Sequence, residues 1–480
     1  MRRISGPLVL CGWLLSVAGC GSGNGQGTAG SGGGTAGASG GGTGGSISTA
    51  GTGGSAAGTG GVAGGSGNCT FTQSSTISTR IGTVGIVTWS TDLPGPTSAK
   101  IDFGLTPAYG MTAPVSTVAA SNRTLLLGMK QTRTYNYRIT VMSGATTCTS
   151  DNYTIMTGSL LNGLMKPTLS PATANGLSGG FLITAQYQGT PTTAYILDAD
   201  GDYVWAYGNV GTGLTGARMN WAGTHMWINS ANVPGPNAHN VRRVTMDGLM
   251  EENLSSEFTS MNHQLTVLPD ETVAFYAYGA NGCDDVKERA PDGTVKTVAS
   301  SKTVLLSNAS MCHLNNIQYS MEDDSLVFSN LQSSQIAKVK RSDGSMVWIM
   351  NGSTSTIPGI SWAGGNHGIH LLGLNRLVIF NNNAESLGGT GPSMAKEYTF
   401  SVTGGSEVWS YTASPAQPNM VMGDVQRMPN GNTIVAYSTR GVLDEVNAQG
   451  MLLQRMTTAV AGSTFGYIEK RATLYGPPPR

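Results

Sequence analysis

The sequence predicts an all-β protein: a six-bladed β-propeller preceded by a small β-sandwich. Two observations lead to this fold class. From about residue 160 onward, one strand–turn–strand element recurs six times, at intervals of about 45 to 60 residues, the length of a four-stranded propeller blade. No stretch of the chain shows a convincing helical period of apolar residues. We therefore expect the propeller to occupy residues 160–480.

The recurring element is a hairpin with a glycine in its turn. Asp-Gly stands between the two strands in several copies, and it favours a tight turn because both central residues adopt positive φ. We expect residues 179–186 to pair with residues 466–475 and close the ring. The six copies predict six blades and lie at 194–208, 240–254, 286–298, 336–352, 396–412 and 443–456.

Residues 69–158 show short alternating strands separated by Pro/Gly turns. Trp89 lies in an early strand, and Tyr135 and Tyr137 lead a late one. This segment resembles a fibronectin type III or immunoglobulin-like sandwich, in which an early Trp packs in the core and a Tyr fixes a corner. The resemblance implies a spacer or a docking surface rather than a catalytic domain.

The N-terminus has the layout of an export signal. Two arginines precede an apolar run that is too short to cross a bilayer. Residues 1–20 end in Val-Ala-Gly-Cys, which resembles the lipobox of bacterial lipoproteins. That resemblance implies lipidation of Cys20 and an exported lipoprotein. Gly21 in place of Asp favours the outer membrane, on its periplasmic or cell-surface face. The alternative is an ordinary signal peptide with an incidental cysteine.

Residues 21–68 contain 23 glycines and no charged residue. Burial cannot offset the chain entropy of such a segment, so we expect a disordered tether. Over the whole chain the net charge is zero and only 11% of residues are charged. This balance argues against nucleic acid as a partner, because phosphate binding needs a basic surface. The membrane, reached through a lipid on Cys20, is an expected partner.

Four cysteines remain once Cys11 and Cys20 are assigned to the signal segment. An even number in an exported protein predicts disulfides. Three pairings are possible, and locality within domains favours Cys69 with Cys148 and Cys283 with Cys312. A metal site is the weaker alternative, because no two of these cysteines are close in sequence.

A second repeated element lies between the hairpins, at residues 263–278, 313–331, 367–382 and 423–438. When the turns of these copies are aligned, His263, His313 and His367 share one repeat position. The first strand of each blade lines the central channel, so we expect these three histidines to converge on it. His367 and His370 are three residues apart on one strand, so we expect His370 to face away from the channel as a structural residue.

These residues resemble the bacterial arylsulfotransferase family over residues 160–480. The similarity rests on the strand that begins at His263, the His-x-Asn motif at His313 and Asn315, the Asn-His strand at His367, and the segment 424–437. The family consists of exported six-bladed propellers that move sulfate from an aryl sulfate to a phenol. The resemblance implies these substrates, no nucleotide donor, no cofactor and no metal.

Carried over to this sequence, the resemblance makes His367 the nucleophile and His313 and His263 its supporting residues. A neutral imidazole nitrogen can attack sulfur and form a covalent sulfohistidine, which divides the transfer into two steps. A second imidazole can donate a proton to the departing phenoxide and later accept one from the incoming phenol. Protonated imidazoles would also stabilise charge on the sulfuryl oxygens.

The sequence departs from the family pattern at two places. Where the family has an arginine beyond the middle histidine, this chain has Asn330 or Leu331, and it has Gly368 where the family tends to have Asp. An asparagine cannot replace a charged, bidentate arginine. The candidate substrate-binding residues are Asn315, Asn330 and Arg427. The positive charge that the missing arginine would supply is expected from Arg427 or Arg218 on another blade.

Three other functions remain open from the sequence. The first is a non-catalytic propeller lipoprotein that binds a ligand or protein at the cell surface. The second is an interaction module led by the sandwich, residues 69–158. The third is a metal site held by three imidazoles, which is disfavoured because the family resemblance explains the histidines without a metal.

Overall fold

The structure is a computed structural model, and it describes residues 69–479 except for 116–117, 172–176, 189–191, 209, 211–212, 231–240, 280–282, 306–311, 460–461 and 463. The expected signal segment with Cys20 and the expected tether lie outside the described residues. Regular structure among these residues is mostly β-strand, and the helices described are single turns: α1 (Ser301–Val304), η2 (Glu385–Leu387) and η3 (Ser438–Arg440). In the described part of the chain, no helix combines the length and apolar character needed to cross a membrane.

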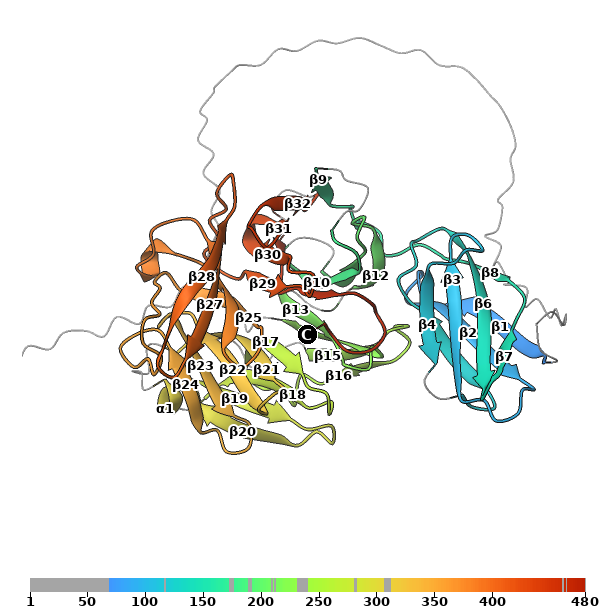
Figure 1. Cartoon of the computed structure of the whole chain (residues 1–480), viewed down its shortest axis with the longest axis horizontal. Coiled ribbons are helices and arrows are strands. Elements are labelled where there is room, and N and C mark those ends of the chain that lie inside the picture. Colours follow the sequence, from blue (N-terminus) through green and yellow to red (C-terminus); the bar gives the residue numbers. More distant parts are fainter. Residues whose placement is uncertain are drawn as a thin grey trace, which may run out of the picture. The chain divides into compact units, whose positions relative to one another are not determined.

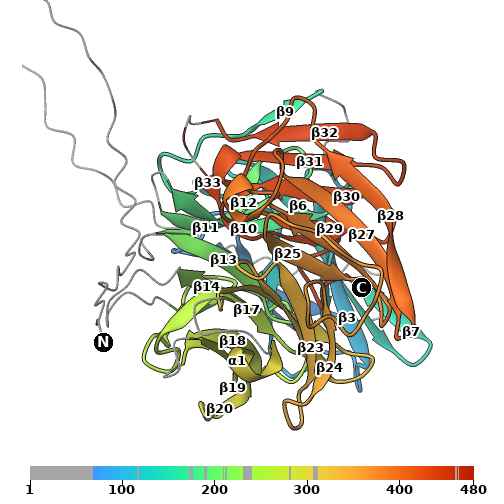
Figure 2. The same ribbon diagram turned by 90° about the vertical axis from the view of Figure 1, so that its left-hand side faces the viewer.

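Six antiparallel sheets follow one another along the chain as the blades of a β-propeller, which confirms the predicted fold class (Figure 1, Figure 2). Each of the four middle blades uses four consecutive strands. Blade 2 contains β13 (Leu214–Met219), β14 (His225–Ser230), β15 (Val241–Thr245) and β16 (Glu251–Asn253). Blade 3 contains β17 (Met261–Val267), β18 (Val273–Tyr278), β19 (Asp284–Arg289) and β20 (Val295–Ser300). Blade 4 contains β21 (Leu314–Ser320), β22 (Ser325–Asn330), β23 (Gln335–Lys340) and β24 (Met346–Met350). Blade 5 contains β25 (Asn366–Leu371), β26 (Arg376–Asn381), β27 (Met394–Ser401) and β28 (Gly404–Thr412).

Blades 1 and 6 each combine strands from the N-terminal and the C-terminal end of the propeller segment. Blade 6 is formed by β29 (Asp424–Arg427), β30 (Thr433–Tyr437), β31 (Val442–Val446) and β32 (Leu452–Thr457), and β9 (Thr168–Ser170) pairs with β32. Blade 1 is formed by β10 (Phe181–Gln188), β11 (Thr193–Leu197) and β12 (Tyr203–Gly208), with β33 (Thr464–Phe465) and β34 (Glu469–Arg471) paired to β10. Because Leu182 pairs with Lys470, the expected closure of residues 179–186 by residues 466–475 is confirmed.

The inner strands of neighbouring blades contact one another in chain order, from β13 through β17, β21 and β25 to β29. Figure 1 shows them near the middle of the propeller, with β20, β24 and β28 farther out. Apolar side chains fill the space between successive sheets; Phe380 of β26, for example, packs on Tyr437 of β30 with ring centroids 5.6 Å apart. This packing fixes the distances between the inner strands, on which the candidate site depends.

Ahead of the propeller, two antiparallel sheets enclose a separate apolar core that contains Trp89 and Tyr137. One sheet is formed by β1 (Phe71–Ile77), β2 (Gly85–Thr91) and β5 (Asn122–Leu126). The other is formed by β4 (Met111–Val115), β3 (Ser98–Gly104), β6 (Thr134–Ser143), β7 (Thr146–Thr149) and β8 (Tyr153–Met156). The fibronectin type III resemblance stays a prediction.

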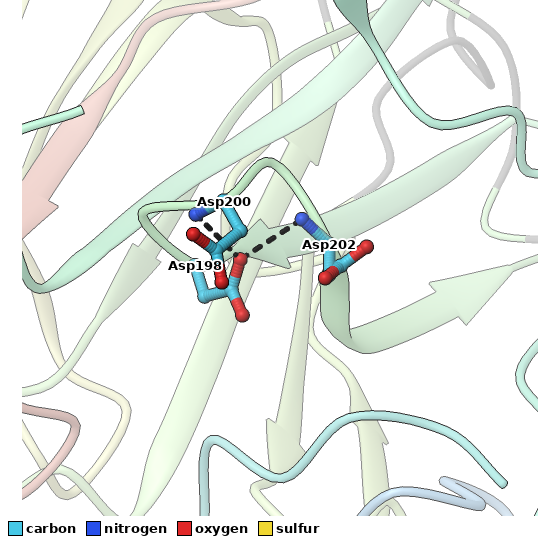
Figure 3. Close-up of side chains that lie close together, drawn as sticks. All are labelled: Asp198, Asp200 and Asp202. Atoms are coloured by element: carbon cyan, nitrogen blue, oxygen red, sulfur yellow. Dashed lines mark hydrogen bonds between the residues drawn. The ribbon is translucent and has the colours of Figure 1, made fainter. Parts of the chain in front are cut away.

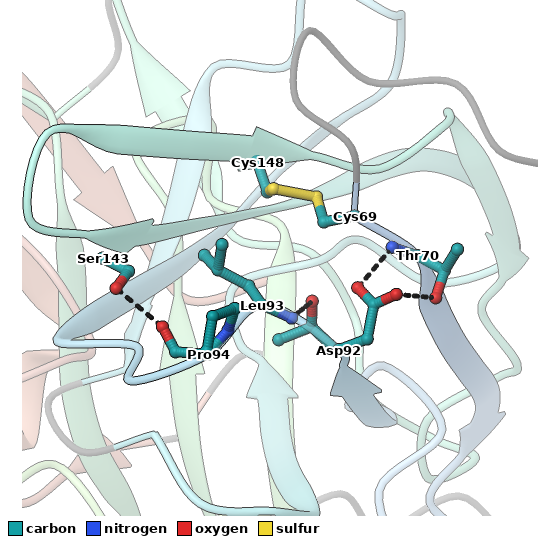
Figure 4. The surroundings of a disulfide bond; sticks show 8 residues. Cys69, Thr70, Asp92, Leu93, Pro94, Ser143 and Cys148 are labelled. Atoms are coloured by element: carbon teal, nitrogen blue, oxygen red, sulfur yellow. Dashed lines mark hydrogen bonds between the residues drawn. A yellow bond between two sulfur atoms is a disulfide. The ribbon is translucent and has the colours of Figure 1, made fainter.

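A disulfide joins Cys69, two residues before β1, to Cys148 of β7, as expected (Figure 4). Next to it, the Asp92 carboxylate accepts hydrogen bonds from the Thr70 backbone N–H at 2.7 Å and the Thr70 hydroxyl at 2.8 Å. The Ser143 hydroxyl donates to the Pro94 carbonyl at 2.8 Å. These contacts tie the start of the sandwich to its closing strands. The second expected disulfide, between Cys283 and Cys312, is also present, so both predicted pairings are confirmed.

Candidate active site

Three histidines lie at the beginning of the inner strands of three consecutive blades. His263 belongs to β17, His313 directly precedes β21, and His367 belongs to β25. At this level all three strands lose regular register with their neighbours, because each carries a β-bulge. A bulge inserts extra residues into one strand and turns the side chains there out of the usual alternation. The chain therefore departs from regular pleating at the height of the histidines.

The bulges determine which residues are equivalent between blades. The first regularly paired residues after them are Leu265, Ile317 and Ile369. His263, Asn315 and His367 each lie two residues before one of these positions. His313 lies two residues before Asn315, so it is not equivalent to the other two histidines. The expectation that the three histidines share one repeat position is therefore wrong for His313. An alignment of the turns could not detect this difference, because the number of residues between the bulge and the turn is not the same in all three blades.

Side chains from the preceding blade hold each bulge in place by binding a backbone carbonyl. The Asn229 amide of β14 donates to the His263 carbonyl at 2.6 Å, and the Ser329 hydroxyl of β22 donates to the His367 carbonyl at 2.9 Å. The Tyr276 hydroxyl of β18 binds the Asn316 carbonyl in the same way. His263 itself has a φ of 43°, in the left-handed region. A backbone conformation that is unfavourable for a side chain persists only where surrounding contacts fix it.

The structure brings the three imidazoles together. Nε2 of His263 and Nε2 of His313 lie 2.8 Å apart, a hydrogen bond in which one ring donates and the other accepts. The ring centroid of His367 lies 6.0 Å from that of His263. His367 is nearly fully buried, with 1% exposure, while His263 and His313 are partly exposed. The site is therefore a hydrogen-bonded imidazole pair beside a third, buried imidazole.

Burial lowers the pKa of each of the three imidazoles. Burial, and then the neighbouring His313 and His367, hold the pKa of His263 well below its usual range. Burial lowers the pKa of His313 to about 4. The pKa of His367 falls to about 3 through burial, despite a hydrogen bond to Asn382 that raises it. All three rings are thus neutral at neutral pH in the ligand-free protein, and each keeps a nitrogen lone pair.

The other predicted site residues take different places. Asn315 is buried and its amide donates to the Asn366 carbonyl at 3.3 Å. Asn330 does not replace an arginine, because its side-chain oxygen accepts the His313 backbone N–H at 3.1 Å and so fixes the backbone of that histidine. Arg427 binds the Glu397 carboxylate and lies over the Trp409 ring, 4.7 Å from its centroid. In the described residues, no arginine or lysine hydrogen bonds to any of the three imidazoles.

A cavity of about 360 Å³ opens where the inner strands of all six blades end. Its lining includes Arg218, His370, Asp424 and Arg427 but none of the three clustered histidines. The expectation that His370 faces away from the channel is therefore wrong. The prediction assumed that side chains alternate without interruption between the two faces of the strand. The bulge at His367 and Gly368 shifts this alternation by one residue, so His370 faces the cavity. Nδ1 of His370 accepts the Arg427 backbone N–H at 2.9 Å.

Asp424 occupies the space beside Gly368. A Cβ on Gly368 would lie 2.4 Å from the Asp424 carboxylate and 2.5 Å from its Cα, too close for any side chain. Burial raises the pKa of Asp424 to about 6, against the lowering effect of Arg218. Asp424 of the next blade therefore excludes any side chain, including a carboxylate, at position 368. Sequence reasoning missed Asp424 because that contact joins residues 56 positions apart.

The Cys283–Cys312 disulfide lies beside the imidazole pair. Cys312 directly precedes His313, and Cys283 directly precedes Asp284, whose carboxylate accepts the Leu314 backbone N–H at 2.8 Å and the Asn262 amide at 3.3 Å. Asn262 in turn precedes His263 in the chain. Together the disulfide and Asp284 connect the backbones on which His263 and His313 are placed.

Replacing both Cys283 and Cys312 with serine is expected to lower the free energy of unfolding by about 3 to 4 kcal/mol, because the bond spans 29 residues of the unfolded chain. Urea unfolding followed by tryptophan fluorescence measures this change. Amide exchange at Leu314 should accelerate as well, whereas serine at Cys69 and Cys148 should leave it unchanged. An unaltered unfolding midpoint and an unaltered Leu314 exchange rate would contradict a structural role for the bond.

A group of carboxylates suited to a cation lies elsewhere in the propeller. In the described residues, the ligand atoms of His, Cys, Asp and Glu gather closely enough for a metal ion only at Asp198, Asp200 and Asp202 (Figure 3). The Lys130 ammonium lies 3.2, 2.6 and 2.7 Å from these three carboxylates, and Lys166 binds Asp202 as well. The positive charge at this turn is thus supplied by lysine.

Asn382 is a further residue in contact with the histidine cluster, and sequence reasoning missed it too. Its side-chain oxygen lies 2.6 Å from Nδ1 of His367. The available signal was the run Asn381-Asn382-Asn383 at the end of an apolar strand, where polar residues have a structural or functional reason to be buried.

Comparison with known proteins gives a family match for part of the chain. Residues 283–459 match the model of the arylsulfotransferase (ASST) family, which confirms the resemblance over that segment. No curated protein matches the chain at a significant level. Among solved structures, TolB from Acinetobacter baumannii is 10% identical over 72% of this chain and 80% of its own, with a TM-score of 0.44. A protein of unknown function from Bacteroides caccae is 11% identical over 61% of this chain and 98% of its own, with a TM-score of 0.42.

Proposed function

We propose that this chain, which carries an arylsulfotransferase domain at residues 283–459, transfers a sulfuryl group from an aryl sulfate to a phenol through His367. The observation that carries the proposal is the cluster of His263, His313 and His367 on three adjacent blades, with one imidazole hydrogen-bonded through Nδ1 and the other two paired. In the described residues, Nε2 of His367 has no hydrogen-bond partner, so its lone pair is available for attack.

In the first half-reaction, Nε2 of His367 attacks the sulfur of the aryl sulfate. A nitrogen–sulfur bond forms while the bond from sulfur to the aryl oxygen breaks, and the electron pair leaves with that oxygen. In the second half-reaction, the oxygen of the acceptor phenol attacks the same sulfur, and the nitrogen–sulfur bond breaks. The electron pair returns to Nε2, so the imidazole ends the cycle unchanged.

The His263–His313 pair is suited to carry the proton between the two halves. Both rings are neutral in the ligand-free protein, but a bound sulfate anion within about 4 to 6 Å favours a protonated ring. The pair then gives one proton to the leaving phenoxide and recovers one from the acceptor phenol. Only one proton is shared, because two adjacent buried imidazolium ions repel each other.

A second candidate function is a propeller that binds an aryl sulfate or another ligand without turnover. One observation favours it: the guanidinium groups of Arg218 and Arg427 bind protein carboxylates and carbonyls rather than the histidine cluster. Losing an anion-binding donor can reduce a rate constant about 100- to 1,000-fold. In this case the chain would retain the fold and the histidines but bind its ligand without reacting.

Incubating the purified protein with 4-nitrophenyl sulfate and varied concentrations of phenol distinguishes the two candidates. Transfer predicts 4-nitrophenol release that depends on the acceptor, with the parallel double-reciprocal plots of a ping-pong reaction. Calorimetry on the same samples measures donor binding. Donor binding without any release of 4-nitrophenol would favour the binding function and overturn the proposed transfer.

We further propose that the chain is an exported lipoprotein anchored through Cys20. The supporting observations are the lipobox-like sequence before Cys20 and the two disulfides, which form in oxidising compartments. In a bacterial host fed with labelled palmitate, the wild-type chain is expected to incorporate label into the membrane fraction, and Cys20→Ser to lose it. Equal labelling of both chains would exclude this anchor.

A further inference from the structure

His367 makes one side-chain hydrogen bond in the described structure, and that bond determines the position of its proton. Nδ1 lies 2.6 Å from the side-chain oxygen of Asn382. A neutral imidazole carries one N–H and one lone pair, and an amide oxygen can only accept. The proton of His367 must therefore sit on Nδ1, which leaves the lone pair on Nε2.

The orientation of the Asn382 amide follows from its other contacts. Its nitrogen lies 2.7 Å from the Asn419 carbonyl and 2.9 Å from the Met422 carbonyl, so both of its hydrogens are donated. Turning the amide over would place its oxygen against two carbonyl oxygens and lose both of these hydrogen bonds. The oxygen of Asn382 is consequently the atom that faces His367, without reference to the imidazole itself.

The surroundings of Asn382 hold this arrangement rigidly. The Ser393 hydroxyl donates to the backbone carbonyl of Asn382 at 2.8 Å and accepts the backbone N–H of Asn419 at 2.8 Å. Met422 has a φ of 62°, in the left-handed region, and its carbonyl also accepts the Asn419 amide at 2.9 Å. These residues are all buried. A buried polar network in which each member has a partner is rigid and specifies one arrangement.

We propose that Asn382 is a positioning residue that fixes His367 as the Nδ1–H tautomer and directs the Nε2 lone pair at the substrate. The catalytic part of this inference rests on the proposed function, because it requires His367 to be the nucleophile. In the opposite tautomer the proton occupies Nε2, and that nitrogen cannot attack sulfur. The tautomer itself is a property of the folded protein and can be measured without any substrate.

Nitrogen-15 NMR of histidine-labelled protein at pH 7 tests the tautomer directly. The expected spectrum assigns a protonated Nδ1 and an unprotonated Nε2 to His367, whose signals are identified by their loss in His367→Asn. Asn382→Leu removes the acceptor and is expected to convert His367 to a mixture of tautomers. Asn382→Asp keeps an acceptor and is expected to retain Nδ1–H. A protonated Nε2 in the wild-type protein would overturn the inference, whatever the activity of the protein.

Kinetics test the consequence for transfer. Asn382→Leu is expected to reduce kcat about 10- to 100-fold with little change in KM, by analogy with the loss on removing the hydrogen-bond partner that orients a metal-binding histidine. Ser393→Ala is the matched control, because it weakens the same buried network without a change in contact with His367. In this variant, His367 should keep the wild-type tautomer. If Asn382→Leu leaves the tautomer unchanged, or if Ser393→Ala lowers kcat equally, Asn382 is merely structural. If the tautomers behave as expected in a wild-type protein that transfers nothing, the proposed function fails and the assignment of the proton stands.

Discussion

His367→Asn is expected to reduce sulfuryl transfer about 10⁴- to 10⁶-fold, the loss seen when an enzyme is deprived of its nucleophile. Asparagine is close in size to histidine and can be buried at the same place, but the lone pair of its amide nitrogen is delocalised into the carbonyl and does not attack sulfur. The fold should survive, because the His367 carbonyl, which accepts the Ser329 hydroxyl, belongs to the backbone. Initial rates of 4-nitrophenol release measure the effect, and the far-ultraviolet circular dichroism of the variant should match the wild type.

The covalent intermediate gives the same prediction an independent measurement. With donor present and acceptor absent, the wild-type protein is expected to gain the mass of one sulfuryl group on the peptide that contains His367. His370→Asn is the matched control, since His370 lies on the same strand but contacts the Arg427 backbone instead of the histidine cluster. It should retain both the modified peptide and most of the rate. Transfer by His367→Asn at the wild-type rate would remove His367 from the mechanism.

The features that follow from local sequence were predictable. The repeated hairpins predicted the blades, because a glycine turn between alternating strands constrains only neighbouring residues. Pairing of residues 179–186 with residues 466–475 followed from the need to close a ring, and the two disulfides from the number and location of the cysteines. The convergence of the three histidines followed from placing them on inner strands of adjacent blades. Each inference used short segments and one rule of architecture.

The geometry within the site was not predictable in the same way. Bulges change the alternation of a strand by one residue, and nothing in the residues around His367 indicates whether a bulge is present. The predicted orientation of His370 failed for that reason. Asn382 contacts His367 from just beyond the neighbouring strand, and Asp424 packs against Gly368 from the next blade, so both contacts depend on packing distances that a single sequence does not encode. Arg427 was a predicted substrate-binding residue, but Glu397 of the neighbouring blade binds its guanidinium. The sequence alone does not show that this positive charge already has a partner.

Acidification is expected to destabilise the fold between pH 6.5 and about 4, because buried histidines stay neutral there while the unfolded chain takes up protons. The pKa of His313 and that of His370 are lowered to about 4, the pKa of His367 to about 3, and the pKa of His263 well below its usual range. A group with a lowered pKa in the fold binds fewer protons than in the unfolded chain, so the free energy of unfolding falls as pH falls. Each such histidine contributes about 1.4 kcal/mol per pH unit at most.

Two buried carboxyl groups act in the opposite direction over part of this range. Burial raises the pKa of Asp284 and that of Asp424 to about 6, so the fold takes up protons on these groups before the unfolded chain does. Below pH 6 they offset part of the histidine effect, and the slope should be steepest just below pH 6.5. Because four histidines oppose two carboxyls, the net result is still a loss of stability on acidification.

Urea unfolding at pH 7.5, 6.5, 5.5 and 4.5 measures this dependence. His370→Gln is the informative variant, since it removes one buried imidazole outside the proposed catalytic cluster and should flatten the curve by about 1.4 kcal/mol per pH unit at most. Replacing a histidine does not alter the slope if that ring is protonated in the fold. A His370→Gln variant with the same slope as the wild type would therefore mean that the fold does not hold the His370 imidazole neutral. The same comparison for His367→Asn tests whether the imidazole of the proposed nucleophile is held neutral, so this stability measurement also bears on the chemistry.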